Sequence, residues 1–152
     1  MKIGLAADHA GFELKQKILI ELSRANIEVV EFGAFSLNPD DDFPDFVIPM
    51  ARAVGNGELD RGIAICGSGI GACIAANKVR NARAGLVHDL VSARQGVEDD
   101  NMNIICLAGN LDWFAMVWEL IEGFLNAHYK DDARFERRLK KIHETEEMEL
   151  QA

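Results

Sequence analysis

The fold is decided by Ile63-Ala64-Ile65-Cys66-Gly67-Ser68-Gly69-Ile70-Gly71, an apolar run that ends in a cysteine and then alternating glycines. Such a run predicts a buried strand, and the glycines predict a tight turn that leads into a helix. The stretch places a thiol beside backbone N–H groups at a helix start. This arrangement favours an anion site next to a reactive group.

On both sides of this stretch, short apolar runs alternate with amphipathic stretches, which is typical of repeated βα units. The alternation predicts an α/β fold, a Rossmann-like three-layer αβα sandwich with a five-stranded, mainly parallel sheet. We expect strands at 2–7, 27–32, 62–66, 84–87 and 103–107, and helices at 11–24, 46–55, 70–78, 89–97 and 112–128.

The length and composition fit a single domain over residues 1–152, because 152 residues with 49% hydrophobic content bury one full core. The 112–128 segment is apolar on more than one face, which suits a subunit interface. The tail, 131–152, is mostly charged, with Phe135, Leu139 and Ile142 as a narrow apolar stripe. We expect it to form a C-terminal helix that packs on a partner subunit.

Several classes of partner are excluded by composition. A net charge of -9 opposes binding to duplex nucleic acid, which requires clustered cations. No run approaches the roughly 18 apolar residues of a membrane span, and the first residues lack the apolar region of a signal peptide. Three cysteines in apolar surroundings, without metal-ligand spacing, fit a reducing compartment. We expect a cytoplasmic protein with no nucleic-acid or membrane partner and no structural metal.

Polar residues occur beside the predicted strands, where open α/β sheets bind their ligands beyond the carboxyl ends. We expect these residues to converge on one rim of the sheet. The candidates are Asp8 and His9 after the first strand, Cys66 to Gly69 after the third, His88 and Asp89 after the fourth, and Asp99 and Asp100 in the segment entering the fifth.

Cys66 is the sharpest candidate for chemistry. A thiol near helix-start amides loses its proton more easily, and the thiolate then serves as a base or nucleophile. The amides of the glycine turn could face a developing oxyanion. The alternative is a buried cysteine that acts as a small hydrophobe. Cys73 and Cys106, expected in mid-helix and mid-strand, are predicted to be structural.

Other features also leave two interpretations open. Gly67, Gly69 and Ala72 match a dinucleotide fingerprint, with Asp89 downstream at about the right distance for a ribose, although the pattern follows the third strand. Asp8 suits an ordinary helix N-cap. Lastly, Arg134 and Arg138, four residues apart, form either a phosphate-binding face or a solvated helix surface.

Five segments together resemble a known family. They are Asp8-His9-Ala10-Gly11, Asp42-Phe43-Pro44-Asp45, Cys66-Gly67-Ser68-Gly69-Ile70-Gly71, Ile74-Ala75-Ala76-Asn77-Lys78, and Val87-His88-Asp89 with Ser92-Ala93. They resemble the ribose-5-phosphate isomerase B and galactose-6-phosphate isomerase family over nearly the whole chain. The resemblance implies aldose–ketose isomerisation of a phosphorylated sugar through an enediolate, without metal or cofactor. It also implies a homodimer with shared sites, which could pair into a tetramer.

The resemblance assigns roles to single residues. Cys66 would move a proton between C1 and C2, Ser68 would stabilise or protonate the oxygens, and Asp8 would contact sugar hydroxyls. The implied substrate-binding residues are His9, Gly67, Gly69, Ile70, Gly71, Asn77, Asp99 and Asp100. The implied phosphate-binding residues are His9, Arg134 and Arg138, the arginines reaching across from a partner subunit.

The chain also departs from the family's pattern. Family members commonly carry a ring-opening His-Asn pair where this chain has Asp99 and Asp100, and an arginine where it has Leu111; a tyrosine and a histidine are replaced by Phe43 and Phe135. Since the proton-transfer residues are retained, we hypothesise an altered substrate, such as an open-chain tetrulose phosphate. Two other classes stay open, a nucleotide- or NAD-binding protein and a catalytically silent sugar-phosphate-binding relative.

Overall fold

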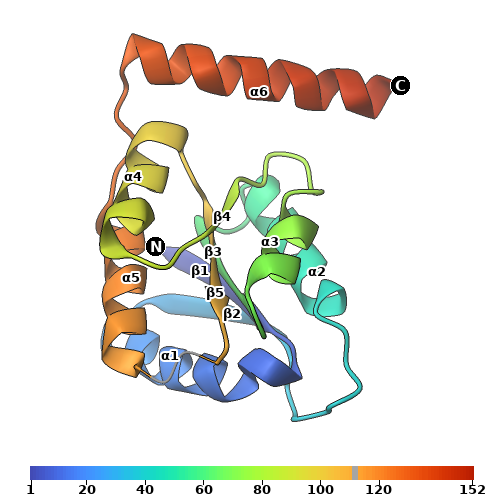
Figure 1. The fold of residues 1–152 in the computed structure, drawn as a ribbon, viewed down its shortest axis with the longest axis vertical. Helices are drawn as coiled ribbons and strands as arrows, with labels where there is room; N and C mark the ends of the chain where they lie inside the picture. Colours follow the sequence, from blue (N-terminus) through green and yellow to red (C-terminus); the bar gives the residue numbers. More distant parts are fainter. Residues whose placement is uncertain (111–112) are drawn as a thin grey trace.

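The computed structural model describes residues 1–110 and 113–152, and strands and helices alternate along these ranges (Figure 1). The strands are β1 (Lys2–Ala7), β2 (Glu28–Gly33), β3 (Arg61–Cys66), β4 (Ala84–Leu86) and β5 (Ile104–Ala108). The helices are the 3-10 turn η1 (His9–Gly11), α1 (Phe12–Arg24), α2 (Pro44–Gly55), α3 (Ile70–Ala76), α4 (Leu90–Asp100), α5 (Phe114–Asn126) and α6 (Ala133–Gln151).

In the described ranges the strands form one parallel sheet in the order β2-β1-β3-β5-β4. One apolar cluster joins a face of the sheet to α1, α4 and α5, and a second joins the other face to α2 and α3. Figure 1 shows these two helical layers on either side of the sheet. The predicted three-layer αβα sandwich is therefore confirmed.

The elements follow from the apolar pattern of the chain. Strand β3 is buried from Gly62 to Cys66, and α1 places Leu14, Ile18 and Leu22 in the core at helical spacing. Helix α2 begins at Pro44, two residues before the predicted start, because proline suits the first turn of a helix. No helix in the described ranges is long and apolar enough to cross a membrane.

Helix α6 lies across one end of the molecule, apart from the two helical layers (Figure 1). The Asp132 side chain caps it by accepting a hydrogen bond from the Arg134 backbone N–H at 2.8 Å. The Glu146 carboxylate accepts from the Asn81 N–H at 2.9 Å and holds α6 against the chain that follows α3. Phe135 is the buried residue of the predicted apolar stripe. The predicted C-terminal helix is confirmed, and its packing on a partner stays a prediction.

Different candidate residues lie at the amino ends and at the carboxyl ends of the strands. Ile104, the first residue of β5, pairs with Gly62 and Ala84 near the starts of their strands. Asp99 and Asp100 end α4 just before this point, so they lie at the amino edge of the sheet. The prediction that they share the rim with Cys66 is wrong within one chain. In a parallel sheet, the segments that precede the strands lie at the amino ends, and the segments that follow the strands, such as the Cys66 loop, lie at the carboxyl ends.

Candidate active site

The Cys66 loop joins the carboxyl end of β3 to α3, as the sequence predicts. Cys66 is 4% exposed, and its sulfur accepts a hydrogen bond from the Ala72 backbone N–H at 3.4 Å. Ser68 is exposed, and its hydroxyl oxygen accepts from the Ile70 N–H at 3.2 Å. Gly69 has a φ of 75°, and a Cβ there would lie 2.9 Å from the Leu107 carbonyl carbon. Glycine is therefore required to turn the chain so that the thiol faces the first turn of α3.

Neighbouring strand ends bring two further segments against this loop. The Asp8 N–H donates to the Ile65 carbonyl at 3.4 Å, which joins the end of β1 to the end of β3. The Gly67 position faces Ala10 of η1, since a Cβ on Gly67 would lie 3.6 Å from the Ala10 Cβ. Asp8, His9 and the Cys66 loop therefore share one rim, as predicted.

Phe43 closes the other side of the loop. A Cβ on Gly71 would lie 2.6 Å from the tip of the Phe43 ring, so the ring lies directly on this glycine. Phe43 directly precedes α2, at the end of the acidic loop that the sequence predicts. An apolar ring at this point gives the rim a wall without a polar group.

Asp8 is the N-cap of η1, which is one of the two roles that the sequence predicts for it. Its Oδ1 accepts from the N–H groups of Ala10 at 3.0 Å and Gly11 at 3.2 Å, and the residue is 6% exposed. The cap fixes the carboxylate against η1. A fixed carboxylate at the rim is also positioned to accept hydrogen bonds from a ligand.

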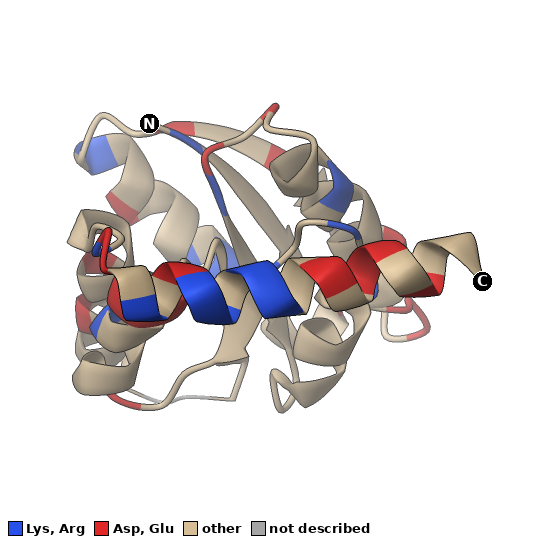
Figure 2. Ribbon diagram, turned by 90° about the horizontal axis from the view of Figure 1, so that it is seen from above, with Lys and Arg blue, Asp and Glu red and all other residues tan. Residues whose placement is uncertain are grey.

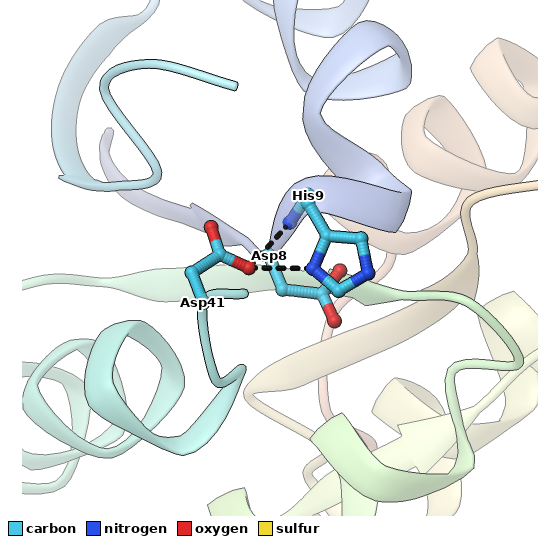
Figure 3. Close-up of side chains that lie close together, drawn as sticks. All are labelled: Asp8, His9 and Asp41. Atoms are coloured by element: carbon cyan, nitrogen blue, oxygen red, sulfur yellow. Dashed lines mark hydrogen bonds and ion pairs between the residues drawn. The ribbon is translucent and has the colours of Figure 1, made fainter. Parts of the chain in front are cut away.

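The contact between His9 and Asp41 was not predicted from the sequence (Figure 3). Asp41 Oδ1 accepts from the His9 backbone N–H at 2.9 Å and lies 2.7 Å from His9 Nδ1. The hydrogen bond to Asp41 raises the pKa of His9; burial opposes this, and the charges of Asp8 and Asp41 add to it. The run Asp40-Asp41-Asp42 predicted only an acidic loop, because residues 32 apart in sequence show no pattern that reveals their contact.

The same residues are the metal-ligand candidates in the described part of the chain, since ligand atoms of Asp8, His9 and Asp41 lie within 4.8 Å of one another. Asp41 Oδ1 already takes two N–H hydrogen bonds, and Figure 3 shows its second oxygen turned away from the other two residues. A protonated imidazole does not ligate a metal. The geometry fits an ion pair better than a metal centre.

Several predicted site residues lie away from this rim. Asn77 follows the far end of α3, where its side-chain amide binds both the N–H and the carbonyl of Ala84 at 2.9 Å. Asp99 accepts from the Gln95 side chain at 3.1 Å on α4. Arg134 and Arg138 are exposed on α6. Leu111 lies outside the described residues. Within one chain, the structure does not bring Asn77, Asp99, Asp100, Arg134 or Arg138 to the Cys66 loop.

The other two cysteines differ from each other. Cys106 is buried in mid-strand as predicted, and its hydrogen bond to Cys73 and its burial raise its pKa. Cys73 is half-buried, and the hydrogen bond from the Cys106 thiol lowers its pKa to about 6. The Leu86 backbone and the Asn77 amide add to that lowering, against the effect of burial. This acidity was not expected from a mid-helix cysteine.

A cavity of about 730 Å³ lies elsewhere, between α6, α4 and the edge strand β4. Its lining includes Leu86, Met102, Ile142 and Leu150, together with Asp100. Since it contains none of the residues of the Cys66 loop, it is separate from the rim. Its apolar lining fits a protein segment better than a sugar.

Comparison with known proteins assigns the chain to a family. A family model described as Ribose/Galactose Isomerase matches residues 3–142. The chain belongs to this family. The ribose-5-phosphate isomerase B of Mycolicibacterium paratuberculosis is 35% identical over 146 residues, which cover 96% of this chain and 92% of that protein.

Solved structures agree with this assignment. The ribose-5-phosphate isomerase B of Clostridium thermocellum has a TM-score of 0.92 and 38% identity, over 97% of this chain and 99% of that chain. The Mycoplasma genitalium enzyme, solved with bound ribulose-5-phosphate, has a TM-score of 0.90 and 35% identity, over 96% of both chains. The chain is thus a sugar-phosphate aldose–ketose isomerase, and the comparisons do not favour the nucleotide-binding alternative.

Proposed function

We propose that Cys66 is the base of a cofactor-free isomerisation, moving a proton between C1 and C2 of a phosphorylated sugar through an enediolate. The observation that carries this is the place of the thiol, which faces the first turn of α3 on the rim that also holds Asp8. A thiolate there receives a backbone N–H hydrogen bond, which stabilises its charge. Its burial keeps water from competing for the proton.

The rest of the rim supplies the other groups that this reaction needs. Ser68 and the backbone amides of Gly67, Gly69 and Gly71 are the donors for the enediolate oxygens, and the Ile70 N–H holds the Ser68 hydroxyl in place. Asp8 accepts hydrogen bonds from sugar hydroxyls. His9 is the phosphate ligand on the same rim, and its contact with Asp41 favours its cationic form.

The site needs a second copy of the chain, and we propose a homodimer. Arg134 and Arg138 lie on α6, at the end of the molecule opposite to the carboxyl ends of the strands where Cys66 lies. They can therefore bind the phosphate only in a partner's site. Asp99 and Asp100 can likewise contact a sugar only across the interface. The apolar cavity beside α6 and the exposed Ile142 and Leu150 that line it support an interface at this end of the molecule.

The substrate that we propose is an open-chain four-carbon ketose phosphate. Phe43 on Gly71 gives the rim an apolar wall, and Asp99 and Asp100 offer acceptors where the family commonly has a histidine and an asparagine. An open-chain sugar needs no ring-opening acid. A shorter sugar also loses no hydrogen bond at an apolar wall, whereas a longer one would leave a hydroxyl unpaired there.

The role of Cys66 is tested with Cys66→Ala and Cys66→Ser, with Cys73→Ala as the control because it removes a thiol from the adjacent helix. We expect kcat to fall by about 10³-fold in Cys66→Ala, as for the loss of a general base. Deuterium uptake from D₂O at C1 or C2 should stop. Cys73→Ala should exchange as the wild type does. Unchanged exchange in a folded Cys66→Ala variant would contradict the proposal.

The substrate proposal is tested with a panel of four- to six-carbon sugar phosphates. We expect the largest kcat/KM for a tetrulose phosphate. Comparable kcat/KM for ribose 5-phosphate would contradict the altered substrate while leaving the reaction class intact. Binding of the sugar phosphates without any proton exchange would instead indicate a catalytically silent relative.

A further inference from the structure

One carboxylate oxygen of Asp41 accepts two hydrogen bonds from His9. Oδ1 accepts the His9 backbone N–H at 2.9 Å and lies 2.7 Å from Nδ1 of the ring. The Asp41 side chain is 8% exposed, whereas that of His9 is 37% exposed. A carboxylate removed from water therefore holds a ring whose other side stays accessible.

This geometry fixes which ring nitrogen meets a ligand. A carboxylate acceptor requires a proton on Nδ1, so the ring cannot rotate or change tautomer without losing the bond. Figure 3 shows the second ring nitrogen on the side of the ring away from Asp41. That nitrogen is the one left to donate to a substrate.

The surroundings of the second Asp41 oxygen indicate that the carboxylate acts on His9 through its negative charge. Oδ2 is buried and has no hydrogen-bond partner among the residues that the structure describes. A buried carboxylate with an unused oxygen is unfavourable unless a cation compensates it. His9 is the group that can do so, and the other carboxylate that acts on its charge is Asp8.

We propose that Asp41 is a positioning residue that holds His9 as an imidazolium, so that its Nε2–H donates to the phosphate of the substrate. This inference rests on the proposed function, in which His9 is a phosphate ligand. The cation and its fixed direction matter most with a phosphate dianion, because charge-assisted hydrogen bonds are the strong ones. Asp41 itself does not touch the substrate.

The first test measures the ionisation of His9 itself. Two-dimensional ¹H–¹⁵N spectra of the full chain, assigned with His9→Gln, follow the ring through a pH titration in the wild type, in Asp41→Asn and in Asp40→Asn. Asp40 is the matched control because it is an exposed neighbour in the same loop. We expect a raised pKa of His9 in the wild type and in Asp40→Asn, and a lower one in Asp41→Asn. Equal pKa values in all three would overturn the proposal.

The second test uses inorganic phosphate as the probe. We expect phosphate to shift the His9 resonances in the wild type, and Asp41→Asn to raise the Kd about tenfold at a pH between the two His9 pKa values found in the first test, the loss of one charge-assisted hydrogen bond. At a pH below both of these pKa values, where the ring is charged in both proteins, the two Kd values should converge. Phosphate that leaves the wild-type His9 resonances unmoved, or an equal Kd at the pH between the two pKa values, would overturn the proposal.

Kinetics then separate this inference from the proposed function. For the best sugar phosphate, the ratio of KM in Asp41→Asn to KM in the wild type should rise about tenfold from a pH below both His9 pKa values to a pH between them, with kcat nearly unchanged in the variant. An active enzyme whose KM follows the same pH profile in both proteins would refute the role of Asp41. A wild type without isomerase activity, but with the phosphate response of His9, would refute the proposed function instead.

Discussion

The thiol of Cys73 has a lower pKa than its place in the middle of a helix predicts. It lies within α3, half-buried, yet the hydrogen bond from the Cys106 thiol lowers its pKa to about 6. The thiolate fraction of Cys73 therefore rises as the pH rises through about 6. Alkylation requires the thiolate, so its rate follows that fraction and the exposure of the sulfur.

We expect iodoacetamide to label Cys73 with a midpoint near pH 6, well below that of an ordinary thiol, and to leave the buried Cys106 unlabelled. Peptide mass spectrometry of samples quenched at a series of pH values measures both. In Cys106→Ala the midpoint of Cys73 should move upward, since its donor is gone. A midpoint near 8.5 for Cys73 in the wild type would contradict the prediction.

Gly69 is the glycine of the Cys66 loop that tolerates substitution least. It has a φ of 75°, and a Cβ there would lie 2.9 Å from a backbone atom of Leu107 and 2.6 Å from the Leu86 side chain. Gly57 has nearly the same φ of 76°, but a Cβ there would meet no atom of the described residues within 4 Å, so it serves as a matched control. The pair separates backbone strain from collision.

We expect Gly57→Ala to lower the free energy of unfolding by about 1 kcal/mol, the strain of a left-handed backbone. Gly69→Ala should lose about 2 kcal/mol more, because the added methyl group overpacks the contact with β5. Urea unfolding of both variants gives the difference. Equal losses would show that the loop moves away from Leu107 at little cost.

At the scale of elements, an ion pair with a buried lysine and a partly exposed glutamate joins α1 to β2. Lys15 is fully buried in α1, and its ammonium group pairs with the Glu31 carboxylate of β2. Lys2 and Glu28 form an exposed pair at the start of the same strand, 3.5 Å apart. The two pairs offer a comparison of buried and exposed charge within one strand.

We expect Glu31→Gln to lower the free energy of unfolding by about 3 kcal/mol, because it leaves the ammonium group buried without a counter-ion. The double variant Lys15→Met with Glu31→Gln should recover most of that loss, and Glu28→Gln should cost less than about 1 kcal/mol. Urea unfolding measures all three. A small loss in Glu31→Gln would mean that water reaches Lys15 when its partner is removed.

The elements also show which parts of the site were predictable. Cys66, Ser68 and Asp8 were placed correctly, because a strand followed by glycines and a helix determines the local path of the chain. The contact between Asp41 and His9 was not, since it depends on how a long loop returns to η1. Asp99 and Asp100 were assigned to the carboxyl ends of the strands, but they lie at the amino ends. The alternation of strands and helices already implies this, because a helix that precedes a parallel strand ends near the amino end of that strand.

At the scale of the whole molecule, the charges of α6 do not suit an isolated helix. Figure 2 shows its Lys and Arg residues in the first half, with Glu136 among them, and its other acidic residues in the second half. The helix macrodipole favours the reverse order, with anions near the N-terminus. The apolar side chains of Ile142, Met148 and Leu150 on this helix are also exposed. This pattern is consistent with α6 acting on a second copy.

The proposed homodimer makes a prediction that no single chain can satisfy. In the proposed two-fold dimer, each rim would take Cys66 from one chain and the cations of α6 from the other. Cys66→Ala and the double variant Arg134→Ala with Arg138→Ala should each lose most activity, for different reasons. A hybrid of the two variants would contain one rim with both defects and one complete rim.

We therefore expect activity to return when the two inactive variants are mixed, unfolded and refolded together. An equal mixture should reach about a quarter of the wild-type rate, because about half of the dimers are hybrids and each has one complete site of two. Turnover of the sugar phosphate measures the recovery, and each variant refolded alone is the control. If each chain formed its own complete site, the mixture would stay as inactive as its components, and α6 would then act only on the chain that carries it.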